Sequence, residues 1–415
     1  MELKRVVVTG IGALTPIGNT FQEYWNALAN GVSGAAPITL FDASMFKTQF
    51  ACEVRFNPED FFDRKEARKL DRCGQLGIIA AREAVHHSGI LESAPNKERI
   101  GVIWGSGIGG IRTFEEEVSN FATGNGIPRF NPFFIPKMIA DITPGHISME
   151  YGFMGPNYTT VSACASSTNA IIDAAMLIQL GKVDAVVSGG SEAAVTASGI
   201  GGFNAMHALS VRNDDPKTAS RPFDKDRDGF VMGEGGAALI LEEYEHAKAR
   251  GAKIYAEFIG GGLSADAHHL TAPHPEGLGA YNVMRNAILD SKIKLEEVDH
   301  INMHGTSTPL GDIAETKAIQ KLFGKHAYNI QINSTKSMTG HLLGAAGATE
   351  AVSIIGAIMH DKVPPTINHF TDDENLDPRI NYTFNKAVDR EINIAMSNTF
   401  GFGGHNACVV FKKYK

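Results

Sequence analysis

The chain has 415 residues, of which 43% are hydrophobic and 20% are charged, and its formal net charge is −8 at pH 7. This composition is typical of a soluble globular protein, and the acidic balance argues against general nucleic-acid binding, which needs local positive charge. No run approaches the roughly 20 uninterrupted apolar residues of a membrane-spanning helix. The cysteines Cys52, Cys73, Cys164 and Cys408 are far apart and form no C-x-x-C pair, so we expect a reducing, cytoplasmic setting without a zinc site or disulfide framework.

Short β-rich runs alternate with helical runs along the whole chain, which predicts an α/β fold with buried parallel or mixed strands. The predicted strands lie, in chain order, within residues 5–12, 99–107, 157–163, 183–190, 237–244, 300–307, 329–337 and 391–400. Segments 157–187 and 329–363 follow one plan, in which a strand leads through a Ser-containing turn into a helix that is apolar or small on every side. Such a helix must be buried all round, so we expect a duplicated domain with helices between two sheets, divided into residues 1–255 and 256–415.

One charged stretch in the first half runs against the acidic balance. Lys65, Arg68, Lys69 and Arg72 are spaced at i, i+3, i+4 and i+7, a pattern that places four cations on one face of a helix. The pattern fits a solvated helix face, and it also fits a docking surface for an acidic partner.

Three further motifs mark sites in other proteins but lack their usual context here. "GSGIGG" at 105–110 follows a strand, as a dinucleotide fingerprint does, yet no Asp or Glu occurs between Val118 and Ala140 to hold a ribose. "YEHAK" at 244–248 has the spacing of a dehydrogenase motif but lies in a polar helical run. The stretch from Asp224 begins like a calcium loop but has Gly235 at its twelfth position, so we expect no calcium site.

The residues with the clearest chemistry follow predicted strands. Cys164 lies between a strand and a buried helix, where free backbone N–H groups and the helix dipole favour a thiolate and predict a lowered pKa. In the second half, His304 follows one strand, and Lys336 and His341 follow another. Because crevices form at the carboxyl ends of parallel strands, we expect these four residues to share one site with Cys164 as the nucleophile.

Four segments carry a resemblance to a known family. "VSACASS", "HGTSTPLGD", "STKSMTGHLLGAAG" and "SNTFGFGGHN" are similar to signature segments of the β-ketoacyl-acyl-carrier-protein synthases, condensing enzymes of fatty acid synthesis with the thiolase fold. The likeness runs from "RVVVTGIGALTPIGN" to "ACVVFKK", which is nearly the whole chain. It implies a duplicated α-β-α-β-α layered fold with two mixed sheets and buried central helices. The Cys-His-His set with a lysine distinguishes the chain from thiolases and from the initiating synthases.

The resemblance also implies a role for each site residue. Cys164 would receive an acyl chain from acyl carrier protein as a thioester, and His304 and His341 would stabilise the enolate formed when malonyl carrier protein loses carbon dioxide. The backbone N–H groups of Cys164 and Phe400 would hold the oxyanion. Lys336 would orient and polarise the site with Glu350 as its charge partner. No redox cofactor and no metal ion is implied.

The remaining implied contacts concern substrate and partners. Ile108 and Phe203 would contact the acyl chain, with Phe400 as a moving gate, and the pantetheine arm would meet Thr271, Thr306 and Thr308. The carrier protein would dock on Lys65, Arg68 and Lys69, and the enzyme would be a homodimer that binds neither nucleic acid nor membrane.

Three departures and two alternatives qualify this resemblance. His405 replaces a Thr of many relatives, and Phe130 and His207 replace basic residues that help some relatives hold the carrier, which predicts a shifted or weaker interface. Ile108 favours the class II elongating enzymes over class I. A ketosynthase of a polyketide or aryl-polyene pathway has the same catalytic residues, and a chain-length-factor-like subunit has the same fold without the thiol.

Overall fold

The structure, a computed structural model, describes residues 3–93 and 95–415. Its main element is one ten-stranded sheet, whose two ends are β5 and β10. In chain order the strands are β1 (Val6–Leu14), β4 (Ile100–Gly105), β5 (Asn157–Thr160), β6 (Ala185–Glu192), β7 (Gly235–Glu243), β8 (Ala256–Ala265), β9 (His300–Asn302), β10 (Gln331–Asn333), β13 (Ile394–Gly401) and β14 (His405–Lys412). Two short ribbons pair β2 (Ala36–Pro37) with β3 (Phe50–Ala51), and β11 (Lys362–Val363) with β12 (Val388–Asp389).

The sheet consists of two copies of one five-strand pattern. The first half has the order β5-β4-β6-β7-β1, and the second half has β10-β9-β13-β14-β8. In each half the first three strands of this order are parallel to one another. The fourth strand pairs antiparallel with the third, and the fifth pairs antiparallel with the fourth. The halves meet through three residue pairs between β1 and β8. The two mixed sheets predicted from the sequence are therefore present as two halves of one continuous ladder.

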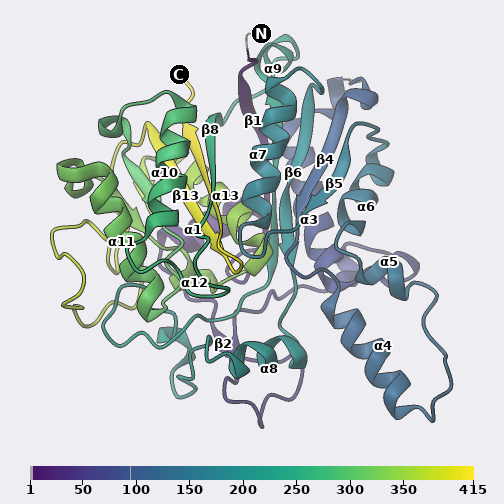
Figure 1. The fold of residues 1–415 in the computed structure, drawn as a ribbon. Helices are drawn as coiled ribbons and strands as arrows, with labels where there is room; N and C mark the ends of the chain where they lie inside the picture. The colour runs from purple at the N-terminus through teal and green to yellow at the C-terminus, as the bar shows by residue number, and fades with distance from the viewer. Residues whose placement is uncertain (1–2, 94) are drawn as a thin grey trace.

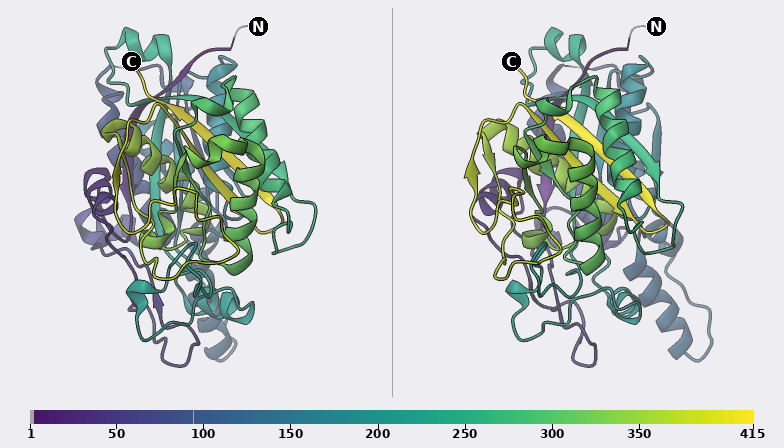
Figure 2. Two further views of the ribbon diagram at one scale, coloured as in Figure 1. Left: turned by 90° about the vertical axis from the view of Figure 1, so that its left-hand side faces the viewer. Right: turned by 60° about the vertical axis from the view of Figure 1, so that its left-hand side comes forward.

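Helices form layers on both sides of each half and between them (Figure 1). Their bounds are α1 (Phe21–Ala29), α2 (Arg64–Ala67), α3 (Arg72–Ser88), α4 (Ile111–Thr123), α5 (Phe134–Met138), α6 (Ile142–Tyr151), α7 (Ser166–Gln179), α8 (Ala197–Ala205), α9 (Tyr244–Ala249), α10 (Leu278–Ser291), α11 (Pro309–Phe323), α12 (Lys336–Thr339) and α13 (Ala346–His360). Helix α3 packs on β1, β6 and β7, whereas α10 packs on β8 and β14. Figure 2 shows α10 and α11, in green, over the yellow strands of the second half.

The two helices predicted to be buried all round, α7 and α13, occupy the central layer. They contact each other and strands of both halves, and their side chains belong to one large core cluster. They approach so closely that a Cβ at Gly347 would collide with Thr168. Small residues are needed at this crossing because the backbones of the two helices lie almost in contact.

One helical segment among the described residues is long and apolar enough to cross a membrane by length and composition. It spans Leu343–His360, and 89% of it is buried inside the protein. Its apolar surface is thus accounted for by packing between the two halves of the sheet.

The predicted four-cation helix face is wrong. Helix α2 ends at Ala67, and Asp71 begins a new helix by accepting a hydrogen bond from the backbone N–H of Cys73. Arg72 points inward and forms an ion pair of 2.5 Å with the buried carboxylate of Glu234. The chain turns between the two caps, so only Lys65, Arg68 and Lys69 remain exposed together.

Candidate active site

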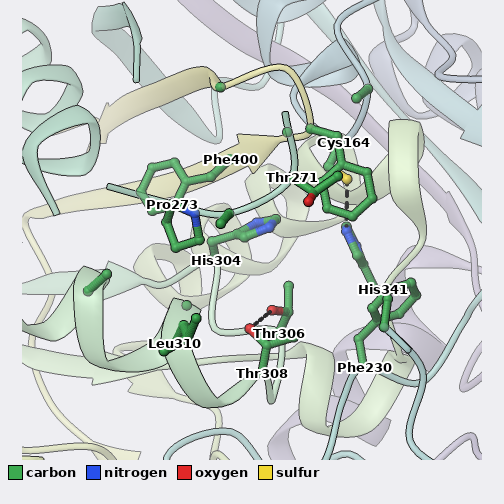
Figure 3. A pocket seen from close by; sticks show the side chains of 18 of the residues that line it. Cys164, Phe230, Thr271, Pro273, His304, Thr306, Thr308, Leu310, His341 and Phe400 are labelled. Atoms are coloured by element: carbon green, nitrogen blue, oxygen red, sulfur yellow. Dashed lines mark hydrogen bonds between the residues drawn. The ribbon is translucent and has the colours of Figure 1, made fainter. Parts of the chain in front are cut away.

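The predicted site residues lie where two sets of three parallel strands end, one set in each half. The carboxyl ends of β4, β5 and β6 in the first half, and of β9, β10 and β13 in the second, meet at the end of the sheet opposite the chain termini (Figure 1). The loops that follow them enclose a cavity of about 600 Å³ whose lining includes Cys164, His304 and His341. Figure 3 shows the Cys164 sulfur pointing at the His341 imidazole, with His304 beside it.

A sharp turn between β5 and α7 presents the Cys164 side chain to the cavity. Ala163 has a φ of 51°, in the left-handed region that L residues rarely adopt. The Ser166 hydroxyl fixes the turn, since it accepts from the Ser162 N–H at 3.0 Å and donates to the Ala163 carbonyl at 2.6 Å. The strained residue next to the nucleophile is held by the hydrogen bonds around it.

The nucleophile and the two histidines form a compact set. Nε2 of His341 lies 3.0 Å from Sγ of Cys164, and the His304 and His341 rings stand edge to face with centroids 5.2 Å apart. Burial and the positive charge of Lys336 hold the pKa of both histidines well below their usual range. Both imidazoles are therefore neutral at pH 7, and each can carry a proton on one ring nitrogen.

The lowered pKa expected for the Cys164 thiol is wrong. Burial, assisted by the charge of Glu192, raises the pKa of this thiol to about 12. The Lys336 charge and the backbone N–H groups of Phe402 and Cys164 act in the opposite direction without overcoming burial. The resting group is a thiol, so the sulfur needs a base such as the neutral His341 to become nucleophilic.

The same interaction bears on the predicted oxyanion donors, the backbone N–H groups of Cys164 and Phe400. The backbone N–H that favours a negative charge on the sulfur belongs to Phe402 and not to Phe400. The Phe400 ring packs toward His304, with centroids 5.4 Å apart, and against the core of the second half. The Phe402 ring lies 6.3 Å from that of Phe203 across the cavity lining. The tandem Phe-Gly-Phe-Gly in the sequence offers both residues, and Phe400 as oxyanion donor stays a prediction.

Lys336 forms its predicted ion pair with Glu350, linking α12 to α13. Both side chains are almost fully buried, with exposed fractions of 2% and 3%, and neither lies on the cavity lining. Burial raises the pKa of Glu350 to about 7, although the Lys336 charge lowers it. The Lys336 charge thus acts on both histidines through its electrostatic field without lining the cavity.

Two buried carboxylates escaped the sequence analysis. Glu315 accepts hydrogen bonds from the backbone N–H groups of His304 at 2.9 Å and Gly305 at 3.0 Å, and so fixes the loop that carries His304. Glu192, at the end of β6, occupies a comparable position beneath Cys164. A lone acidic residue inside an otherwise apolar or small run was the available signal for Glu192, whereas Glu315 lies in a polar helical run that gave no such signal.

The other predicted contact residues divide into two groups. The cavity lining includes all five predicted substrate contacts, namely Ile108, Phe203, Thr271, Thr306 and Thr308. The Thr306 and Thr308 hydroxyls are 3.0 Å apart (Figure 3). The exposed cations Lys65, Arg68 and Lys69 lie outside the lining.

The three departures and the "GSGIGG" motif also have definite places. His207 lies on the cavity lining, whereas the exposed Phe130 and His405 do not. The backbone N–H groups of the "GSGIGG" loop donate to the Glu192 carboxylate, which occupies the place a phosphate would need. Within residues 3–93 and 95–415, no three His, Cys, Asp or Glu side chains form a group that could hold a metal ion.

Comparisons with known proteins agree with this arrangement. A family model of the β-ketoacyl synthase N-terminal domain matches residues 3–247, and one of the C-terminal domain matches residues 255–370. A protein of Synechocystis sp. named 3-oxoacyl-[acyl-carrier-protein] synthase 2 is 50% identical over 418 residues, covering 100% of this chain and 99% of that protein.

Two solved structures have the same fold over the whole length of this chain. The ishigamide ketosynthase/chain length factor has a TM-score of 0.92 at 34% identity, with 100% of both chains covered. A type II PKS ketosynthase in complex with its acyl-carrier protein has a TM-score of 0.90 at 31% identity, also with 100% of both chains covered. The chain therefore belongs to the β-ketoacyl synthase family and has its thiolase-like layered fold.

Proposed function

We propose that this chain catalyses the decarboxylative Claisen condensation of malonyl-acyl-carrier-protein with an enzyme-bound acyl thioester, as a class II β-ketoacyl synthase of fatty acid elongation. The products are 3-oxoacyl-acyl-carrier-protein and carbon dioxide. The observation that carries the proposal is the Cys164 thiol, 3.0 Å from a neutral His341 and close to a second neutral histidine, in one cavity.

The first step transfers the acyl chain to the enzyme. His341 takes the thiol proton through Nε2 as the Cys164 sulfur attacks the thioester carbonyl. The tetrahedral oxyanion then accepts hydrogen bonds from the backbone N–H groups of Cys164 and Phe402. The carbon–sulfur bond to the carrier arm breaks, and the departing thiolate receives the proton. Covalent catalysis divides one difficult reaction into two easier ones.

The second step uses both histidines as hydrogen-bond donors. For this step His341 carries its one proton on Nε2, so the ring exchanges its proton between the two nitrogens through solvent after the first step. Neutral His304 and His341 then donate to the thioester carbonyl of the malonyl group, so that negative charge can build on this oxygen as the carboxylate leaves as carbon dioxide. The enolate carbon attacks the acyl carbonyl on Cys164 and forms the new carbon–carbon bond. The Cys164 sulfur departs as a thiolate and regains a proton from solvent. The Lys336 charge supports this role because it keeps both imidazoles neutral.

The acyl and malonyl donors are carried by acyl carrier protein in this proposal. The solved complex of a polyketide ketosynthase with its carrier protein supports a protein-bound donor, and so does the name of the Synechocystis relative. Lys65, Arg68 and Lys69 are exposed and available to an acidic partner. The Lys69 ammonium also lies 5.6 Å from the centre of the Phe133 ring, which places apolar surface beside the cations.

We further propose a cytoplasmic homodimer whose subunits each consist of the halves 1–255 and 256–415. Strand β5 at one end of the sheet has exposed residues, and Val161 just after it is 62% exposed. The opposite end strand is covered, because the backbone N–H of Ile332 donates to the carbonyl of Asn381. Pairing of β5 with its copy would bury an otherwise unpaired edge. Light scattering coupled to size exclusion tests this, and a monomer at micromolar concentration contradicts it.

A polyketide ketosynthase is the second candidate, since one solved relative described above is a type II PKS ketosynthase and the other is a ketosynthase/chain length factor. Their identities of 34% and 31% are well below the 50% shared with the 3-oxoacyl-[acyl-carrier-protein] synthase 2 of Synechocystis sp., which favours elongation. A chain-length-factor-like role is disfavoured because the thiol and both histidines are present together.

Intact-mass spectrometry tests the proposal directly. The protein is mixed with acyl carrier protein carrying chains of increasing length and then with malonyl carrier protein. We expect one acyl adduct on Cys164, discharged by the malonyl donor as a 3-oxoacyl product. No adduct at any length contradicts the synthase. An adduct formed only with polyketide or polyene chains favours the second candidate.

A further inference from the structure

The buried carboxylate of Glu192 has no role in the reaction described above. It is fully buried at the end of β6, and its partners are neutral donors from two loops. One oxygen, Oε2, accepts from the backbone N–H groups of Gly107 at 2.7 Å and Gly344 at 3.0 Å. The other, Oε1, accepts from the N–H groups of Ile108 at 3.2 Å and Gly109 at 3.3 Å. The Ser106 hydroxyl also donates to Oε1, at 3.3 Å.

These hydrogen bonds join the two halves of the molecule beneath Cys164. The donors at 106–109 belong to the loop after β4, whereas Gly344 belongs to the second half and follows His341 by three residues. The loops are so close that a Cβ at Gly344 would collide with the Gly107 nitrogen and with the Glu192 carboxylate. The carboxylate is therefore the common anchor of two segments that are in direct contact.

Both anchored segments also carry residues that line the cavity. Ile108 lies on the lining and is 41% exposed, so packing alone does not hold its side chain. Leu343 lies on the lining as well, next to the anchored Gly344. The position of each side chain follows from the backbone to which it is attached, and Glu192 fixes both backbones.

On the basis of the proposed function, we propose that Glu192 is a positioning residue that sets the acyl-chain length by holding the cavity wall formed by Ile108 and Leu343. Because a single methylene in an apolar pocket already changes selectivity by about tenfold or more, a small shift of this wall alters which chains fit. The residue acts through the wall and does not touch the reacting atoms.

Substitution Glu192→Gln separates this role from general stabilisation. A glutamine has one acceptor oxygen, so it can serve the donors at only one end of the side chain. The shorter hydrogen bonds are those to Gly107 and Gly344, which therefore retain the oxygen. The amide NH₂ then faces the N–H groups of Ile108 and Gly109, and the wall loosens while the turn after His341 stays in place.

The experiment measures kcat/KM for acyl-carrier substrates from short to long chains, together with the rate of malonyl-carrier decarboxylation. In Glu192→Gln we expect the long-to-short kcat/KM ratio to change by about tenfold, because the wall moves. We expect decarboxylation, which depends on the histidines, to stay within about threefold of wild type. A selectivity ratio equal to wild type in a folded Glu192→Gln protein overturns the proposal.

The chain offers a matched control and a milder second variant. Glu83 also accepts two backbone N–H groups, from Ala13 and Phe21, both at 2.8 Å, and it is remote from the cavity. Glu83→Gln should lower the melting temperature without changing the selectivity ratio, and an equal change in ratio overturns the proposal. Ser106→Ala removes a donor to Glu192 and the acceptor of the Gly109 N–H, at 3.1 Å.

The outcomes are distinguishable from failure of the proposed function. If Glu192→Gln does not fold, the long-to-short kcat/KM ratio of Ser106→Ala tests the inference instead. A ratio equal to that of wild type in Ser106→Ala overturns the inference. If wild type acylates Cys164 and all variants share its selectivity, only the role of Glu192 fails. If wild type forms no acyl adduct at any chain length, the synthase proposal fails and the inference that rests on it fails too.

Discussion

Removal of the Lys336 charge should destabilise the protein in a way that depends on pH. Lys336 and Glu350 are buried together beneath the cavity, with exposed fractions of 2% and 3%. Substitution Lys336→Met keeps the length of the side chain but leaves the Glu350 carboxylate without its partner. Breaking a buried ion pair in this way costs about 3 to 5 kcal/mol when the remaining charge stays ionised.

The loss in free energy of unfolding at a given pH follows from the titration of Glu350. Burial raises its pKa to about 7 even with Lys336 present, and loss of Lys336 raises it further. A carboxyl group with a raised folded-state pKa stabilises the protein at low pH, and this contribution is lost as pH rises through the folded pKa. Above about pH 7 Glu350 no longer adds to the stability of the wild type. In Lys336→Met, where the pKa of Glu350 is higher, the free energy of unfolding continues to fall by about 1.4 kcal/mol per pH unit.

Urea unfolding at fixed protein concentration, followed by circular dichroism at about pH 6 and about pH 9, measures this difference. The double variant Lys336→Met/Glu350→Gln is the matched control, because it removes both charges. We expect it to recover most of the lost stability and to show no extra pH slope. A pH-independent loss in Lys336→Met, with no recovery in the double variant, would refute the ion-pair reasoning.

Three further predictions concern the reaction. Cys164→Ala should form no acyl adduct and should lose condensation by at least about a thousandfold with its melting temperature unchanged, and retained 3-oxoacyl product contradicts its role as nucleophile. Because burial and Lys336 keep His304 and His341 neutral, the wild-type rate of malonyl decarboxylation should not fall between about pH 8 and about pH 6. A decline in that interval shows that the histidines become protonated there. Substitution of the three exposed basic residues by acidic ones should raise KM for carrier-bound substrates, more strongly at low salt than at high salt. An unchanged KM would mean that these residues form a solvated surface without a docking role. These cations are Lys65, Arg68 and Lys69.

The elements with a strong local signal were predictable from the sequence. All eight predicted strand segments overlap a strand of the main sheet, and both helices predicted to be buried, α7 and α13, lie in the central layer. The strands β8 and β14 were missed. Three consecutive glycines interrupt β8, and β14 directly follows a pair of glycines. Glycine weakens any local strand signal, and these two strands form because their neighbours in the sheet pair with them.

The sequence by itself determined the alternation of strands and helices, the turn that presents Cys164, and the order of the residues that surround it. Each of these follows from local composition or from a motif a few residues long. Only the tertiary structure decided that Arg72 turns inward to Glu234, that the thiol is protonated at rest, and that the backbone N–H beside the sulfur is that of Phe402. Only it revealed the anchor at Glu192, because that anchor joins groups 152 positions apart in the chain. The physical reason is that burial and long-range hydrogen bonds depend on which distant segments of the chain come into contact. A local sequence pattern contains no information about those contacts.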